Sequence, residues 1–414
     1  MMQSNEISSS CFSATDLNKI RQKKQILNCL HSGGNISAPQ LSKYLRISLP
    51  TCIALLNDLI SIGYVENIGI GESSGGRKPT LYGLPDNQFY VIACDFGRFS
   101  ANMAILDCFN HFVTSIIEID THIDDSLLTG KLYHAAQKLM SDHQIPDEKI
   151  YGIGVDMPGL IDSSAGINYT IQENDRQNIM HDLQQKFGKL VYVDNDARMH
   201  AYGEYRFGAA KEYQDAIVIH WGWGLGLGIF VNGRLFSGNN GFAGEFSHIP
   251  VVENGELCIC GKRGCLETIA SSNTIMKRVQ KGFADNEISS LINQFEGQQE
   301  KVTPEDVINA ARQGDEFCIS ILSEVGKAMG KGLSYIIQLL NPEVIVLSGP
   351  LSKARQYVLF PIQQSLNKLC LEKISGNTSI IISEMGDQSA LLGTSEMVFQ
   401  KLFNEIEFKE LAIK

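Results

Sequence analysis

The sequence predicts an α/β protein in which an N-terminal winged helix-turn-helix module precedes a larger body of strands and helices. Three helical patterns and a glycine-rich hairpin fill the segment up to residue 85. Beyond it, apolar runs typical of buried strands alternate with helical patterns. The first 85 residues carry 8 Lys and Arg against 5 Asp and Glu, whereas the remainder carries 27 against 41. This charge distribution is expected when only the first part contacts nucleic acid.

Composition indicates an ordinary globular protein. The 414 residues suggest two or three domains, with 43% hydrophobic and 20% charged residues and a net charge of −11. The sequence has no apolar run of about 20 residues and no basic-then-apolar leader at its start, so we expect a cytoplasmic protein without a membrane partner. Of the ten cysteines, three cluster and seven are scattered without the spacing of a disulfide framework.

The N-terminal module follows the order helix, helix, turn, helix and hairpin, which is the winged helix-turn-helix plan. Ser37 and Ser48 are good N-caps for the second and third helices, and Gly63 ends the third. In order, the pattern predicts a helix over 16–32, a second over 40–45, a third over 49–62, and strands over 64–68 and 80–82 that flank a glycine-rich turn. The alternative is a small helical module that docks onto another protein.

The third helix of this module contains no Lys or Arg, so bidentate reading of bases by arginine is not available there. Thr51 and apolar side chains would instead contact thymine methyl groups, which predicts an A·T-rich operator. We expect Lys43, Arg46 and Lys78 to contact phosphates. Arg77, beside glycines at the tip of the wing, suits insertion into a narrow minor groove.

A cysteine cluster lies in the segment 243–267, AGEFSHIPVVENGELCICGKRGCLE. Cys258, Cys260 and Cys265, together with His248, are the ligand set of a closed tetrahedral zinc site. The alternative is a turn that contains buried cysteines. Glu245 and Glu267 bracket the cluster, so a bound Zn²⁺ would hold both carboxylates and the second His248 nitrogen in fixed positions.

The pattern AGE-x-x-H followed by C-x-CG-x-x-GC-LE resembles the ROK family of repressors, open reading frames and sugar kinases, and the resemblance covers nearly all of the chain. It implies a two-lobed body of the actin-like, RNase H-like kind, with a zinc site on the four residues above. It also implies that Glu245, His248 and Glu267 contact sugar hydroxyls. Asn195 and Asp196 match the family's N-D-A-N segment, in which the aspartate of the kinases is the catalytic base. Without the resemblance, Asp196 could equally be a helix N-cap.

Two departures from the kinase pattern affect the phosphate loops. The kinases of the family carry D-x-G-x-T-K and G-T-G, whereas this chain has Phe99 at the first hydroxyl position, lacks the lysine, and has Trp223 in the second motif. Bulky aromatic carbon removes hydrogen-bond donors from the phosphate site. Trp221 can be read simply as a packing residue. We therefore expect a sugar-responsive transcriptional regulator, a repressor of carbohydrate genes, without catalytic residues.

Two other functions stay open from the sequence. One is an active ATP-dependent sugar kinase fused to a DNA-binding module, and the other is a repressor relieved by a transport protein. The regulator would bind operator DNA of two-fold symmetry as a homodimer or a dimer of dimers, with a sugar or sugar phosphate as effector. The domains are expected at 1–14 (disordered arm), 15–85 (winged helix-turn-helix), 86–195 with 388–414 (first lobe), and 196–387 (second lobe with the zinc site).

Overall fold

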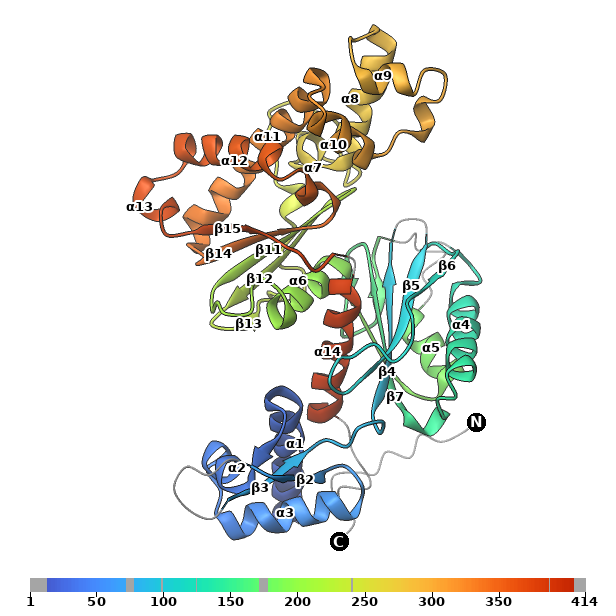
Figure 1. Ribbon diagram of the computed structural model, residues 1–414, viewed down its shortest axis with the longest axis vertical. Helices are drawn as coiled ribbons and strands as arrows, with labels where there is room; N and C mark the ends of the chain where they lie inside the picture. The colour runs from blue at the N-terminus through green and yellow to red at the C-terminus, as the bar shows by residue number, and fades with distance from the viewer. Residues whose placement is uncertain are drawn as a thin grey trace.

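A computed structural model of the chain shows an N-terminal module attached to a body of two lobes (Figure 1). The predicted fold class is correct. The residues that the structure describes are 13–71, 78–97, 100–123, 125–170, 178–239, 241–386 and 388–405. The predicted disordered arm therefore lies almost entirely outside them. Among the helices within these ranges, none combines the length and the apolar character needed to span a bilayer.

The N-terminal module contains the predicted helices and hairpin. Ser37 and Ser48 cap the second and third helices, and the Ser37 cap is closed by Gln40, whose side chain accepts from the Ser37 backbone N–H. Gly63 turns the chain after the third helix with φ 77°. The elements are α1 (Ala14–Gly33), β1 (Ile36–Ser37), α2 (Ala38–Leu45), α3 (Leu49–Ser61), β2 (Glu66–Ile70) and β3 (Thr80–Gly83), with sheet order β1-β3-β2. The tip of the wing, including Arg77, is outside the described residues.

The first lobe is a five-stranded sheet with helices α4 and α5 on one side and α14 on the other (Figure 1). Its central strand, β4, is buried at every position, as its continuous apolar run predicted. The sheet elements are β4 (Tyr90–Phe96), β5 (Ala101–Asp107), β6 (Ile117–Ile119), β7 (Ile150–Met157) and β10 (Leu190–Asn195), in the order β10-β7-β4-β5-β6. The other elements are α4 (Leu128–Asp142), η2 (Asp147–Lys149), β8 (Ile161–Asp162), β9 (Ile167–Asn168) and α5 (Ile179–Phe187).

The second lobe has its own five-stranded sheet, in the order β13-β12-β11-β14-β15, beneath a layer of helices that includes the long α11. Its strands are β11 (Ala216–Trp221), β12 (Leu225–Val231), β13 (Arg234–Leu235), β14 (Val344–Ser348) and β15 (Ser379–Ile382). Its helices are η4 (Phe246–His248), α7 (Glu267–Ala270), α8 (Ser272–Asp285), α9 (Ser290–Gln294), η5 (Gln299–Lys301), α10 (Pro304–Arg312), α11 (Glu316–Leu340), η6 (Pro350–Ala354), α12 (Gln356–Leu369) and α13 (Glu372–Ser375).

The two sheets have the same topology, which identifies the lobes as a structural duplication. In each, an antiparallel hairpin (β4–β5 or β11–β12) extends on one side to a third antiparallel strand and on the other to two parallel strands. A helix follows the fifth strand of each sheet: α6 (Asp196–Phe207) after β10 and α14 (Gln388–Glu405) after β15. These two helices pack against each other between the lobes (Figure 1). The predicted two-lobed body of repeated halves is thus observed.

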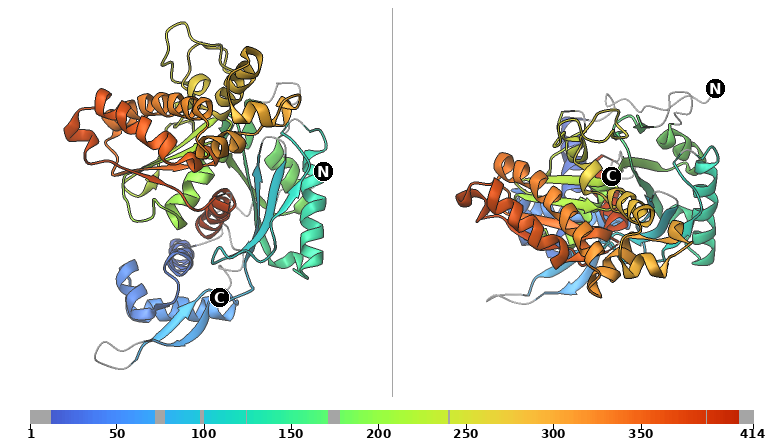
Figure 2. Two further views of the ribbon diagram at one scale, coloured as in Figure 1. Left: turned by 45° about the horizontal axis from the view of Figure 1, so that its top comes forward. Right: turned by 90° about the horizontal axis from the view of Figure 1, so that it is seen from above.

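Helix α14 connects the body to the N-terminal module. It crosses back from the second lobe, covers strands β4 and β7, and also packs against α1 (Figures 1 and 2). Ile26 and Leu30 of α1 belong to the same apolar cluster as Phe399, Leu402 and Phe403 of α14. The module and the first lobe therefore share one continuous hydrophobic core.

Candidate functional site

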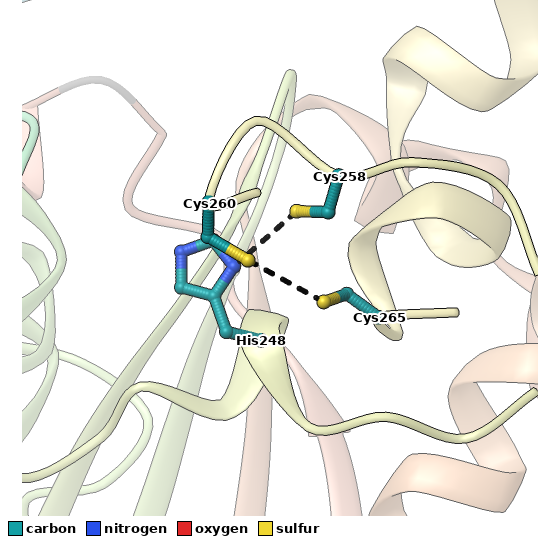
Figure 3. Close-up of side chains that lie close together, drawn as sticks. All are labelled: His248, Cys258, Cys260 and Cys265. Atoms are coloured by element: carbon teal, nitrogen blue, oxygen red, sulfur yellow. Dashed lines mark hydrogen bonds between the residues drawn. The ribbon is translucent and has the colours of Figure 1, made fainter. Parts of the chain in front are cut away.

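The four predicted metal ligands converge in the second lobe (Figure 3). Their ligand atoms all lie within 4.8 Å of one another. The Cys258 Sγ is 3.5 Å from the His248 Nδ1, and the Cys260 Sγ is 3.6 Å from the Cys265 Sγ. Each residue comes from the short 3-10 helix η4 or from the loop before α7. The structure thus brings together the complete ligand set that the sequence spacing indicated.

The cysteine loop is held in shape by its own backbone. The Cys258 N–H donates to the Lys262 carbonyl at 2.8 Å, and the Gly261 N–H donates back to the Cys258 carbonyl at 2.9 Å. Gly261 and Gly264 have φ of 81° and 74°, a conformation that other residues rarely adopt. A Cβ on Gly264 would also collide with the Val252 carbonyl oxygen. The two glycines are therefore required for the turn that directs three sulfur atoms to one point.

The geometry of this cluster fits a tetrahedral metal. Zinc–sulfur bonds of about 2.3 Å place the sulfur atoms of a tetrahedral site about 3.8 Å apart. Nitrogen and sulfur ligands lie about 3.5 Å apart in the same geometry. The observed separations of 3.6 and 3.5 Å match these values. Three sulfur atoms and one imidazole nitrogen therefore lie close enough together to be the ligands of one metal ion.

The second nitrogen of His248 faces away from the cysteines. Its Nε2 lies 3.9 Å from the Glu245 Oε2, while the Glu267 Oε1 lies 3.8 Å from the Cys258 Sγ. Burial raises the pKa of Glu245, although the neighbouring His248 and Arg198 oppose this change. Two carboxylates and one imidazole nitrogen are thus held next to the metal cluster, as expected from the sequence.

Asn195 and Asp196 lie where β10 ends and α6 begins. The Asn195 side chain caps α6 by accepting from the Arg198 N–H at 3.2 Å, and its amide donates to the Gly159 carbonyl at 3.0 Å. Asp196 accepts from the Ala197 N–H at 2.8 Å. The N-cap role considered for Asp196 therefore belongs to its neighbour Asn195. Asp196 is left with one carboxylate oxygen that no hydrogen bond described here engages.

Burial raises the pKa of Asp196 to about 6, with further contributions from the charges of Asp95 and Glu245. A carboxyl group with a pKa near neutrality can donate or accept a hydrogen bond, depending on pH. Asp196 is therefore suited to either role near neutral pH.

Sequence reasoning gave no role to Asp156 and Arg198, whose contacts the structure shows. Asp156 is fully buried on β7 opposite Asp95 of β4, and the Thr394 hydroxyl donates to it at 2.6 Å. Burial, followed by the charge of Asp95, raises the pKa of Asp156 well above the ordinary range. Arg198 binds Asp194, the Gly241 carbonyl and the Ser163 hydroxyl, so it ties the loop before Glu245 to the first lobe. The sequence signal that could have identified Asp156 is a charged residue within the apolar run that ends in VDMPG.

The two tryptophans differ in environment. Trp221 is fully buried and donates from its indole nitrogen to the Ala270 carbonyl at 2.6 Å, so its packing role is confirmed. Trp223 is 40% exposed in the turn between β11 and β12. Phe99, the other aromatic residue predicted to replace a phosphate-binding hydroxyl, lies outside the described residues.

The predicted DNA-contacting residues within the described ranges are exposed in the N-terminal module. Lys43 and Arg46 lie at the end of α2, Thr51 on the first turn of α3, and Lys78 before β3. Arg46 adopts φ 56° as the C-cap of α2. The exposed face of α3 carries Leu49, Pro50, Thr51, Ile53, Ala54, Asn57 and Ile60. Asp58, on the same helix, is partly exposed and pairs with Lys23 at 3.0 Å.

Comparison with known proteins agrees with this architecture. Residues 92–401 match the ROK family, and residues 21–66 match a winged helix-turn-helix DNA-binding family. The chain belongs to the ROK family. The N-terminal module places it among the DNA-binding transcriptional regulators of that family.

Several relatives match over nearly the whole chain. The xylose repressor of Caldicellulosiruptor bescii is 30% identical over 95% of this chain and 98% of its own length. The N-acetylglucosamine repressor of Escherichia coli O6:H1 is 28% identical over 96% of each chain. A crystal structure of a ROK family transcriptional regulator, a homologue of the E. coli Mlc protein, superimposes with a TM-score of 0.82. At 24% identity over 95% of this chain and 99% of that one, it shows the shared fold.

Proposed function

We propose that this regulator is a repressor of carbohydrate genes whose DNA binding is altered by a sugar held between the two lobes. The observation that carries the proposal is the convergence of His248, Glu245 and Glu267 on a single metal-binding loop, in a chain that also has a winged helix. Hydroxyl groups need both donors and acceptors in fixed positions, which a loop tied by a metal supplies.

Each predicted sugar contact has a role consistent with this chemistry. Glu245 and Glu267 would accept hydrogen bonds from hydroxyls, and the His248 Nε2 would bind a further hydroxyl because its Nδ1 faces the cysteines. Asp196 would accept or donate according to its protonation. Asn195 has one amide hydrogen beyond its bond to Gly159, and we propose that this hydrogen completes the contact set.

The metal is proposed to be Zn²⁺, with His248, Cys258, Cys260 and Cys265 as ligands. Three sulfur atoms favour a soft ion over Mg²⁺ or Ca²⁺, and a closed set of four protein ligands is typical of structural zinc. Bound zinc would stabilise the loop and fix the orientation of the His248 ring. Its role is therefore to position the sugar contacts, with no part in chemistry.

On DNA, we propose that Lys43, Arg46 and Lys78 contact phosphates while α3 enters the major groove of an A·T-rich operator. Thr51 lies at the exposed start of α3, beside apolar side chains suited to thymine methyl groups. Arg77 would enter the minor groove from the wing. A homodimer in the cytoplasm would present two such modules to a two-fold operator.

We propose that the domains follow the predicted division of the chain: 15–85 binds DNA, 86–195 with 388–414 forms the first lobe, and 196–387 forms the second.

The raised pKa of Asp196 is the one feature that favours a kinase, since a base that ionises near neutrality suits proton abstraction. Trp223 opposes this alternative, because a bulky aromatic residue takes the place of a phosphate-binding hydroxyl.

The proposal is tested with the full-length protein. Operator sequences are first selected from random DNA, and binding is then titrated by fluorescence anisotropy with xylose, N-acetylglucosamine or glucose present. We expect one sugar to shift DNA affinity, and Glu267→Gln to weaken that response while leaving affinity without sugar unchanged. Lys138→Gln, a change on the exposed face of α4, is the control. If ATP with a sugar yields ADP, and Asp196→Asn abolishes this reaction, the kinase alternative replaces the proposal.

A further inference from the structure

A crevice of about 860 Å³ lies beside α6. None of the five residues proposed to bind sugar (Asn195, Asp196, Glu245, His248, Glu267) lines it. Its walls come from α6, from α14, from the turn between β12 and β13, and from the loop before Glu245. Its volume is within the range of sites that hold small organic ligands, which is about 300–1,000 Å³.

The charge of this crevice is opposite to that of the whole protein. Four cationic side chains, Arg198, Arg206, Arg234 and Lys401, line it together with two carboxylates. The protein as a whole has a net charge of −11. A local excess of positive charge inside a concave surface attracts anions, because field lines concentrate there.

Both carboxylates of the crevice are already engaged by neighbouring groups. Asp194 forms an ion pair with Arg198. Asp162 accepts from the backbone N–H groups of Ser164 and Ala165, each at 3.0 Å, and so closes its own turn. Among the described residues, neither carboxylate forms an ion pair with Arg206, Arg234 or Lys401.

The other three cations have capacity for a ligand. Arg206 forms one ion pair, with the Glu396 Oε1 at 2.8 Å, and its buried Nε has no hydrogen-bond partner among the described residues. Arg234 is exposed at the start of β13, and Lys401 lies over the Tyr192 ring at 4.8 Å. Within the described part of the chain, no carboxylate forms an ion pair with either residue.

We propose that this crevice binds a small phosphate ester. Three cations on three different elements, Arg206, Arg234 and Lys401, can surround a dianion, and the planar guanidinium groups match the geometry of phosphate oxygens. Tyr202 and Tyr205 bring phenol groups to the same walls, which suits an ester that carries hydroxyls. A free phosphate would fill only a small part of the volume, so the bound molecule has an organic portion.

Binding here would bear on the DNA-binding module. The Glu396 carboxylate that holds Arg206 also accepts from the His31 ring of α1 at 2.9 Å. A phosphate that draws Arg206 away would change the charge balance around Glu396 and hence the contact between α1 and α14. By thermodynamic reciprocity, operator DNA would then change the affinity for the phosphate ester.

The test is calorimetric titration of the full-length protein with inorganic phosphate, glucose 6-phosphate and glucose at low ionic strength. We expect glucose 6-phosphate to bind more tightly than inorganic phosphate. Arg234→Gln and Lys401→Gln should each weaken glucose 6-phosphate binding by about fivefold or more, since each removes one partly exposed charge. Lys368→Gln, an equal charge change on the exposed surface of α12, should have no effect.

The variant Asp196→Asn distinguishes binding in the crevice from binding at the predicted sugar site. Because glucose 6-phosphate carries sugar hydroxyls as well as a phosphate, the proposal requires that this variant keeps a glucose 6-phosphate binding event that Arg234→Gln and Lys401→Gln weaken. Circular dichroism confirms that each variant is folded. The proposal is overturned if neither phosphate compound binds, if Arg234→Gln and Lys401→Gln leave binding unchanged, or if only Asp196→Asn abolishes it.

Discussion

The His31 Nε2 lies 2.9 Å from the Glu396 Oε2, while the His31 Nδ1 lies 2.7 Å from the Cys108 carbonyl oxygen. Both partners are hydrogen-bond acceptors, so both ring nitrogens must donate, which is the arrangement of the charged imidazolium ring. Only about 1% of either side chain of the ion pair is exposed. A buried ion pair thus joins α1 of the DNA-binding module to α14 of the body.

Replacing His31 should destabilise the whole protein. His31→Gln leaves the Glu396 carboxylate buried without its cationic partner in α1, which typically costs about 3–5 kcal/mol. Urea denaturation followed by tryptophan fluorescence measures this loss. The control is His111→Gln, because His111 pairs with Asp107 at the surface. A change of similar size in both variants would contradict the expected role of the buried pair.

Acid should weaken the same contact through Glu396. Burial by itself raises the pKa of this carboxyl, but His31, Arg206 and Asn110 outweigh it and lower the pKa to about 2. A carboxyl whose pKa is depressed in the folded state stabilises the protein above its unfolded pKa and loses this contribution as pH falls. We expect about 3 kcal/mol to disappear between pH 4.5 and 2. Glu396→Gln should flatten the stability curve over that interval; an unchanged slope would contradict the prediction.

Asp196 should have the opposite pH dependence. Its pKa of about 6 is above that of an unfolded aspartate, so the stability of the folded state falls as pH rises from about 4 to 6, and the loss is complete above pH 6. Asp196→Asn should therefore stabilise the protein by about 3 kcal/mol at pH 8 and have little effect near pH 4. The same variant should remove any pH dependence of sugar binding between pH 5 and 7. Thermal unfolding at both pH values, with calorimetry for the sugar, tests both expectations.

The metal site gives a stoichiometric prediction. The purified protein should carry about one zinc ion per chain, and Cys260→Ser should lose it and unfold at a lower temperature. Cys370→Ser is the matched control, since Cys370 lies outside the cluster and is half-buried. Metal analysis of a folded preparation made without chelator measures the content. A zinc content that is the same in both variants would rule out these ligands.

The winged helix gives a salt-dependent prediction. Lys43→Ala and Arg46→Ala should each weaken binding to all DNA sequences alike and lower the slope of log affinity against log salt by about one. Arg77→Ala should instead reduce the preference for A·T-rich sites. The control is Lys138→Ala on α4, which carries an equal charge change away from the module. Equal losses of DNA affinity in all four variants would show that net charge, and not the position of the charge, determines DNA binding.

The sequence was most informative where local chemistry determines structure. Ser48 predicted the start of α3, the spacing of Cys258, Cys260 and Cys265 predicted the metal-binding cluster, and the apolar run before Gly97 predicted β4. Each of these signals depends on residues within a few positions of one another, as caps, chelating loops and buried strands do.

Contacts between distant segments could not be predicted in this way. The register that sets Asp156 against Asp95 arises from pairing of strands β7 and β4, and nothing near either residue specifies its neighbour. The bonds of Arg198 likewise depend on how the loop before Glu245 meets α6. Helix α12 was not predicted from the sequence either. It contains Pro361, and proline normally argues against a helix interior.

The shared core of α1 and α14 has a consequence for the order in which the protein is made. His31 and Glu396 are 365 positions apart in the chain. At about 5–20 residues per second, a ribosome needs roughly 20–70 seconds to make the intervening chain. During that time, Ile26 and Leu30 are without the α14 side chains that cover them in the finished protein. A nascent chain can therefore form the winged helix early, but its attachment to the sugar-binding body waits until translation has passed Phe403.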